Sequence, residues 1–165
     1  MPVEIVEYDH RWPARYAREA VRIAAALGPL ARRIEHVGST SVPGLAAKDI
    51  IDIQLSVESF DDAYRAPLEQ LGYVFRPDDE PAHRFFYLPD PARAGRKLVH
   101  IHVCLSGSEW EAVHPRFRDL LRADGELRAA YERLKRDLAP RFEVGNDYAD
   151  AKGPFIRGAL ARGTG

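Results

Sequence analysis

One short apolar segment constrains the fold of this chain more than any other feature. Residues 50–57 read Ile-Ile-Asp-Ile-Gln-Leu-Ser-Val and are nearly continuously apolar. Such a run predicts a strand buried on both faces, near the centre of a sheet. Asp52 stands inside it, and an ionised carboxylate there is costly unless a cation compensates it. A metal ion is one such cation, and a salt bridge to Lys48 or an arginine is the structural alternative.

Helix and strand patterns surround this central segment. Apolar residues spaced by three and four predict a helix over residues 10–27, which Gly28-Pro29 ends. We expect an α+β fold, in which a mixed sheet of about four or five strands packs against helices and the carboxy-terminal half is helical. The other predicted elements are strands at 34–37, 73–75, 84–88 and 98–105, and helices at 59–71, from 108, at 127–138 and from about 147 to 161.

Length and composition exclude several classes of protein. The chain has 165 residues, which favours one domain over 1–165. Its 24 Lys and Arg against 25 Asp and Glu give a net charge of −1, which disfavours nucleic acid as the partner. No stretch approaches the roughly 18 apolar residues of a membrane span. The single cysteine, Cys104, and the absence of a secretory signal pattern lead us to expect a cytoplasmic protein without a membrane partner.

A turn of small residues precedes the central strand. Residues 38–44 read Gly-Ser-Thr-Ser-Val-Pro-Gly. Main-chain N–H groups in such a turn can face one concavity, and the hydroxyls of Ser39, Thr40 and Ser41 can add donors for a phosphate. A tight connection made of small residues is the structural alternative.

Two histidines form a second candidate feature. His100 and His102 lie two positions apart on a predicted strand, so both side chains project to one face. Two imidazoles and one carboxylate suit Mn²⁺, Fe²⁺, Ni²⁺ or Zn²⁺ better than Mg²⁺, which prefers oxygen ligands. The alternatives to metal binding are polar lining of a pocket and hydrogen bonding within the sheet.

The run from Ile34 to Lys48, followed by residues 50–53, closely resembles the GrpB-like (UPF0157) family of the nucleotidyltransferase superfamily. The resemblance implies a nucleotidyltransferase-like fold, in which a Gly-Ser turn holds nucleotide phosphates and strand carboxylates hold Mg²⁺. Further segments similar to the family make the resemblance nearly continuous along the chain: 100–103, 117–122, 131–135, Tyr148, Lys152, Phe155 and Ile156.

The sequence departs from the superfamily at one position. The superfamily presents two carboxylates two residues apart; Asp52 matches the first, but Gln54 stands at the second. An amide is a much weaker partner for Mg²⁺, so two-metal transfer is in doubt. Two functions stay open: nucleotidyl transfer from a nucleoside triphosphate to an acceptor, with Asp52 as the catalytic residue, and non-catalytic binding of a nucleotide or phosphometabolite, including an accessory role in coenzyme A metabolism.

The resemblance also implies a set of ligand contacts. A divalent ion, Mg²⁺ or Mn²⁺ with Zn²⁺ or Ni²⁺ as alternatives, is expected at Asp52, His100 and His102. Some of the expected phosphate contacts are lysines and arginines, and for each of these a surface ion pair is the structural alternative. We predict that Ser39, Asp52, His100 and His102 line one concave site at an end of the sheet. The expected phosphate contacts are Gly38, Ser39, Thr40, Ser41, Lys48, Arg84, Arg118 and Lys152, and the expected pocket neighbours are His36 and Gln54.

Overall fold

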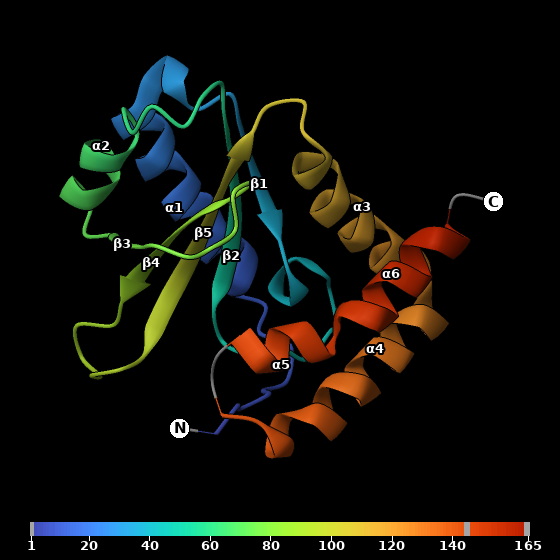
Figure 1. Cartoon of the computed structure of the whole chain (residues 1–165). Helices are drawn as coiled ribbons and strands as arrows, with labels where there is room; N and C mark the ends of the chain where they lie inside the picture. The colour runs from blue at the N-terminus through green and yellow to red at the C-terminus, as the bar shows by residue number, and fades with distance from the viewer. Residues whose placement is uncertain (1, 144–145, 164–165) are drawn as a thin grey trace.

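A mixed five-stranded sheet forms the centre of the computed structural model, which describes residues 2–143 and 146–163 (Figure 1). Its strand order is β1-β2-β5-β4-β3. β2 pairs parallel with β5, and the other neighbours are antiparallel. The predicted α+β class and the interior place of residues 50–57 are therefore confirmed. The strands are β1 (Arg33–Val37), β2 (Ile51–Val57), β3 (Val74–Arg76), β4 (Arg84–Pro89) and β5 (Lys97–Leu105).

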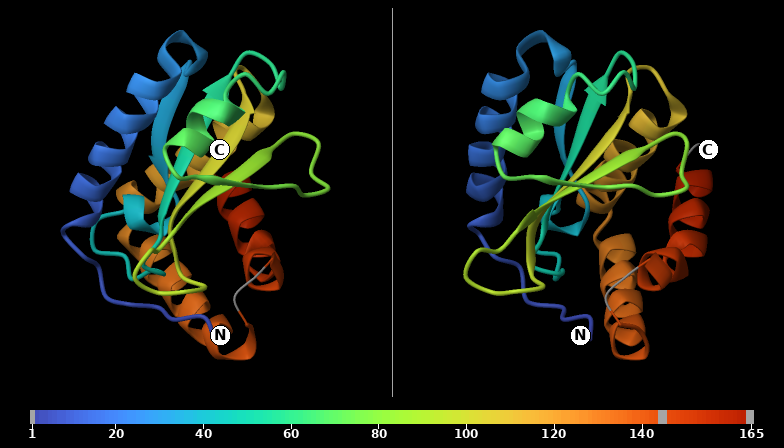
Figure 2. Two further views of the ribbon diagram at one scale, coloured as in Figure 1. Left: turned by 90° about the vertical axis from the view of Figure 1, so that its left-hand side faces the viewer. Right: turned by 60° about the vertical axis from the view of Figure 1, so that its left-hand side comes forward.

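Helices cover both faces of the sheet. Figure 2 shows α1 and α2 on one side and the carboxy-terminal helices on the other. In the described part of the chain, no helix combines the length and the apolar character that crossing a membrane requires. The helices are α1 (Trp12–Leu27), α2 (Arg65–Gln70), α3 (Glu109–Ala123), α4 (Gly125–Leu138), α5 (Asn146–Ala151) and α6 (Gly153–Arg162).

Strand alternation sorts β2 into an apolar face and a polar face. Ile51 and Ile53 are fully buried against the core under α1 and α2. Asp52 and Gln54 project from the opposite face, because successive side chains in a strand alternate. This second face fronts α3 and the other carboxy-terminal helices (Figure 2).

A separate apolar cluster attaches the carboxy-terminal helices to the turn after β1. Val42 and Leu45 from the segment that follows β1 pack with Phe117 and Leu121 of α3 and with Tyr131 of α4. The short 3-10 turn η2 (Ser39–Ser41) lies just before this segment. The cluster therefore holds the small-residue turn between the sheet and the helices.

Two helix predictions differ from the structure. α2 begins at Arg65 rather than Ser59, because Asp61 accepts a hydrogen bond from the Ala63 N–H and Asp62 has a positive φ of 64°, both features of a turn. The predicted last helix is two helices, α5 and α6, that meet at Lys152. Pro154 in the first turn of α6 has no N–H to continue the preceding helix.

Replacing Ile53 should measure how much the core under α1 contributes to stability. Ile53 is 0% exposed, so Ile53→Ala leaves a cavity and should lower the free energy of unfolding by about 2–5 kcal/mol. Val21 is 70% exposed on α1, and Val21→Ala should change that free energy by about 0.5 kcal/mol or less. Urea denaturation of both variants tests the difference; equal losses would contradict the assignment of Ile53 to the core.

Candidate functional site

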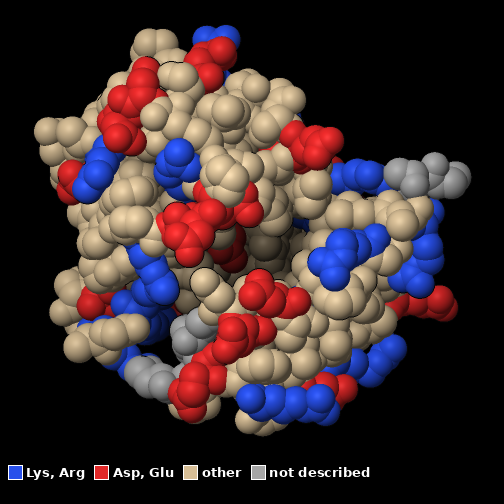
Figure 3. Space-filling model, viewed as in Figure 1, with Lys and Arg blue, Asp and Glu red and all other residues tan. Residues whose placement is uncertain are grey.

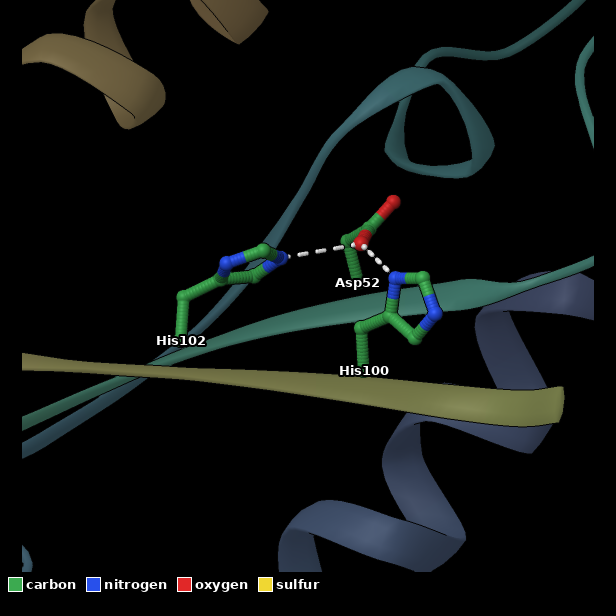
Figure 4. A group of neighbouring side chains, drawn as sticks. All are labelled: Asp52, His100 and His102. Carbon is green, nitrogen blue, oxygen red and sulfur yellow. Dashed lines mark hydrogen bonds and ion pairs between the residues drawn. The ribbon is translucent and has the colours of Figure 1, made fainter. Parts of the chain in front are cut away.

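Asp52 lies between two imidazoles on the polar face of the sheet (Figure 4). Its Oδ1 atom is 3.3 Å from His100 Nδ1 and 3.1 Å from His102 Nε2. The Asp52, His100 and His102 side chains keep exposures of 27, 16 and 26%, so a ligand can reach them. One ligand atom from each residue lies within 4.8 Å of the other two. The structure thus brings together the three residues expected to bind a metal, in a donor set that fits a first-row transition ion.

The local electrostatics favour the forms of these groups that bind cations. Burial opposes ionisation of Asp52, but its contacts with the His100 and His102 imidazoles hold its pKa well below the usual value. Burial lowers the pKa of His100, although Asp52 acts in the opposite direction. An ionised carboxylate beside a neutral imidazole is the state required for metal ligation. The outer nitrogen of His100, Nε2, is buried without a hydrogen-bond partner among the described residues.

Gly38 lies directly against the Asp52 carboxylate. It has φ 72° and ψ −178°, a backbone conformation that is essentially restricted to glycine. A Cβ atom at this position would lie 2.6 Å from Asp52 Oδ2. The turn after β1 therefore meets the middle of the sheet at the candidate metal ligands, in agreement with the prediction that the turn and these residues share one site.

The three hydroxyl residues of the turn have different surroundings. Thr40 is buried, with Oγ1 2.9 Å from His36 Nε2. Ser41 is also buried, and its hydroxyl donates to the Gly38 carbonyl. Ser39 stays partly exposed and contacts the Tyr131 hydroxyl. Of the predicted hydroxyl donors, Ser39 is the one that the turn leaves available to a ligand.

His36 belongs to the opposite side of the sheet. It pairs in register with Ile53, and directly opposed residues share a face, so its ring points toward α1. There it stacks on Tyr16 with ring centroids 4.6 Å apart. Burial lowers the pKa of His36 to about 4. The structure does not place His36 in the pocket, because strand alternation separates it from Asp52.

Gln54 shares the polar face but does not open toward a ligand. It is 0% exposed, and its Nε2 donates to the Glu111 main-chain oxygen at 2.9 Å. This hydrogen bond joins β2 to the first turn of α3. Gln54 therefore anchors β2 to α3, and its burial differs from the pocket-lining role that we expected.

The two arginines expected at the phosphates are engaged elsewhere. Arg84 pairs in register with Val103 on the α1 side of the sheet, and its guanidinium lies 4.2 Å from the centre of the Phe60 ring. Arg118 forms an ion pair with Glu35, with Nη1 2.5 Å from Oε2. The structure therefore does not support phosphate contacts for Arg84 or Arg118: strand alternation carries the first away, and a carboxylate compensates the second.

Three lysines gather at the junction of the turn and the carboxy-terminal helices. Lys48 Nζ and Lys152 Nζ lie 5.3 and 4.5 Å from the centre of the Tyr148 ring. Burial lowers the pKa of Lys152 to about 8; Lys48 lowers it further, and Asp52 opposes the shift. Lys135 is 2% exposed and donates to the Ala46 carbonyl, and burial lowers its pKa to about 7.

Two of these lysines are not in ion pairs, although Asp52 lies near enough to Lys152 to act on its pKa. Among residues 2–143 and 146–163, Lys48 and Lys152 form no ion pair with a carboxylate. Figure 3 shows a hollow between the sheet and the carboxy-terminal helices, with acidic side chains along its rim. The Asp52 cluster lies on the sheet face that turns toward these helices. An anion bound between the two lysines would offset their charge.

Sequence reasoning missed three aromatic side chains beside the cluster. His83 Nε2 lies 3.0 Å from His102 Nδ1, and its ring stacks on Trp110 at 4.7 Å. The His114 ring is 6.5 Å from that of His102. Two patterns could have found them. Phe85 of β4 pairs with His102, and His83 lies two residues before Phe85, so strand alternation places both on the same face. Trp110 and His114 lie one turn apart on α3.

Comparison with known proteins places the chain among similar sequences and structures. The GrpB protein family matches residues 2–162. The UPF0157 protein BH1888 of Halalkalibacterium halodurans is 42% identical over 165 residues, which cover 97% of this chain and 82% of that protein. A dephospho-CoA kinase of Mycolicibacterium paratuberculosis is 34% identical, and the match covers 98% of this chain and 46% of the kinase.

A solved structure agrees with the fold. The crystal structure of the conserved protein GrpB from Enterococcus faecalis has a TM-score of 0.82 and 28% sequence identity to this chain. The match covers 98% of this chain and 100% of the Enterococcus faecalis chain. The arrangement of sheet and helices is therefore that of a GrpB structure.

Substitution of Gly38 should test its close approach to Asp52. Gly38→Ala introduces backbone strain of about 1–3 kcal/mol and a collision with the carboxylate, so the free energy of unfolding should fall by more than the strain alone. Gly44→Ala is the matched control, because Gly44 also has a positive φ, 80°, but open space around it. Thermal or urea denaturation measures both. Adding Asp52→Gly, which removes the carboxylate and also the Cβ atom that would lie 2.9 Å away, should reduce the cost of Gly38→Ala; strict additivity would contradict the contact.

The buried His36 should make stability depend on pH. The unfolded chain takes up a proton as pH falls through about 6.5, whereas folded His36 does so only near pH 4. Its contribution therefore lowers the free energy of unfolding as pH falls through this window, by up to ~1.4 kcal/mol per pH unit. His36→Gln removes the titrating group and should flatten the slope between pH 6.5 and 4.5 in urea denaturation; an unchanged slope would contradict the assignment.

Proposed function

The chain belongs to the GrpB family, and on that premise we propose that it binds a phosphorylated small molecule, with a nucleoside triphosphate as the first candidate, through a divalent metal ion. The observation that carries the proposal is the position of Asp52, His100 and His102 on the same side of the sheet as Lys48 and Lys152, which form no ion pair with a carboxylate among the described residues. A cation site beside unpaired basic groups matches a ligand that carries phosphates and arrives with a metal.

Asp52, His100 and His102 would hold the metal. Their two imidazoles and one carboxylate favour Mn²⁺ or Zn²⁺ over Mg²⁺. A bound divalent ion supplies positive charge that draws phosphate oxygens and offsets their repulsion. Gly38 contributes by its lack of a side chain, because the turn can then lie against the Asp52 carboxylate. The partial exposure of the three ligating side chains leaves room for oxygens of a bound molecule.

Lys48 and Lys152 would contact the phosphates. Both lie over the Tyr148 ring and have no carboxylate partner among the described residues. A phosphate between them would provide charge-assisted hydrogen bonds that their present surroundings do not supply. Ser39 adds a partly exposed hydroxyl from the turn. Lys135 stays behind them, held by the Ala46 carbonyl.

The proposal is limited to binding, because the second strand position does not support nucleotidyl transfer. Two-metal transfer uses charged oxygens to hold both ions. Gln54 offers no charge, it is 0% exposed, and its Nε2 atom donates to the Glu111 main chain. A single ion at Asp52 is sufficient to bind phosphates.

One relative suggests a second phosphorylated ligand to test. The dephospho-CoA kinase of Mycolicibacterium paratuberculosis contains a segment similar to this whole chain. Dephospho-coenzyme A carries an adenosine joined to a pyrophosphate, so it has the same ligand chemistry as a nucleotide. We include it beside ATP as the second candidate.

Binding should depend on the metal and on Lys152 in separable ways. With Mn²⁺ or Zn²⁺ and ATP or dephospho-coenzyme A, the wild-type protein should be stabilised by about 2.7 kcal/mol at a ligand concentration one hundred times Kd, measured by thermal shift. Asp52→Asn should abolish the dependence on the ion. Lys152→Met should keep ion binding but lower the affinity for the phosphorylated ligand by about 10- to 100-fold, which corresponds to the loss of one charge-assisted hydrogen bond. Calorimetry measures both affinities.

Arg18→Met is the matched control for loss of a positive charge. Arg18 is exposed on α1, which packs on the opposite face of the sheet, and its replacement should leave both affinities unchanged. No thermal shift with either ligand and either ion would contradict the proposed function. A shift that persists in Asp52→Asn would assign Asp52 to structural pairing instead.

A further inference from the structure

A line of hydrogen-bonded side chains continues outward from the Asp52 cluster. His102 Nδ1, on the ring edge away from Asp52, lies 3.0 Å from His83 Nε2. His83 Nδ1 in turn lies 3.2 Å from Asp78 Oδ2, in the connection between β3 and β4. Two imidazoles are thus arranged end to end between two carboxylates.

Asp78, at the outer end of this line, sets the direction of its hydrogen bonds. An ionised Asp78 carboxylate can only accept a hydrogen bond, so His83 Nδ1 carries the hydrogen that faces it. The Nε2 atom of a neutral His83 is then an acceptor, and it takes the hydrogen on His102 Nδ1. His102 therefore turns the lone pair of its Nε2 atom toward Asp52. Two acceptors 3.1 Å apart repel each other unless a cation, either a proton or a metal ion, joins them.

We propose that His83 and Asp78 are positioning residues, which hold His102 in the tautomer and ring orientation that bind a metal through Nε2. This inference rests on the proposed metal site. Metal-ligating histidines generally donate their second ring N–H to a carboxylate or another acceptor, and such outer partners set the affinity of the ligand for the metal. Here the outer partner is an imidazole, which a carboxylate orients in its turn.

Packing holds the intermediate imidazole in place. The His83 ring is 7% exposed and lies between the Trp110 ring, at 4.7 Å, and the His102 ring, at 5.2 Å. A buried ring that stacks on Trp110 and is hydrogen-bonded edge to edge with His102 cannot swing to another partner without leaving those contacts. The Asp78 side chain is 32% exposed at the outer end of the line. The orientation of His102 is therefore determined by groups that do not themselves reach the metal.

Two substitutions of His83 separate hydrogen bonding from packing. His83→Phe keeps an aromatic ring against Trp110 but removes both hydrogen bonds. His83→Gln removes the ring, whereas its amide can donate to Asp78 and accept from His102. Co²⁺ titration of the full chain, followed by visible absorption, should show about 10- to 100-fold weaker binding for the Phe variant. The Gln variant should bind with an affinity close to that of the wild type, and Asp78→Ala should weaken binding more than Asp78→Asn.

The tautomer gives a readout that packing alone would not change. In the Zn²⁺-loaded protein, nitrogen-resolved NMR should show His102 protonated at Nδ1, with this proton hydrogen-bonded and slow to exchange with water, and His83→Phe should make its exchange faster. Protonation at Nε2, or equal Co²⁺ affinity in wild type and His83→Phe, would overturn the positioning role while leaving the metal site intact. No Co²⁺ or Zn²⁺ binding by the wild type would overturn the metal site as well. Thermal denaturation of each variant identifies any that is simply unfolded.

Discussion

Parallel pairing between β2 and β5 is the constraint on which the candidate site depends. The register sets Asp52 beside His100 and Gln54 beside His102. Because residues paired across a sheet share a face, all four side chains emerge on the side opposite the apolar core. A shift of β2 by one residue would turn Asp52 and Gln54 into that core and away from the two histidines. The apolar residues that alternate with them, Ile51 and Ile53 among others, make such a shift costly.

Some ionisable side chains around the sheet are in ion pairs that stabilise the fold, and others are not. Burying an ionisable group costs free energy unless a partner compensates it. Asp49 has ordinary partners, since Arg15 and Arg96 both contact its carboxylate at 2.5 Å. Asp52 instead faces two imidazoles, and Lys152 lies over a tyrosine ring without a described carboxylate partner. The contrast separates ion pairs that serve the fold from groups that are available to a ligand.

Local breaks in regular structure also serve the site. Gly38 permits the turn to touch Asp52, and the interruption before Pro154 places Lys152 at the bend between α5 and α6. Lys152 follows Tyr148 by four residues, the spacing at which side chains of a helix are neighbours, and its ammonium lies 4.5 Å from the centre of that ring. Both features cost regular hydrogen bonding, and both bring polar groups toward the same face.

The sequence by itself determined the interior strand, the α+β class and the grouping of His100 with His102, because hydrophobic periodicity and strand alternation are local properties. The motif also identified Asp52 and the turn that contacts it. Local patterns could not decide on which face His36 and Arg84 would lie relative to Asp52, since that depends on pairing between distant strands.

Nor could local patterns find the His83–Asp78 pair, which meets His102 only when β4 folds back on β5. Tertiary structure therefore decided which polar residues share the site, because register and helix packing are set by the burial of the whole apolar core rather than by any one segment.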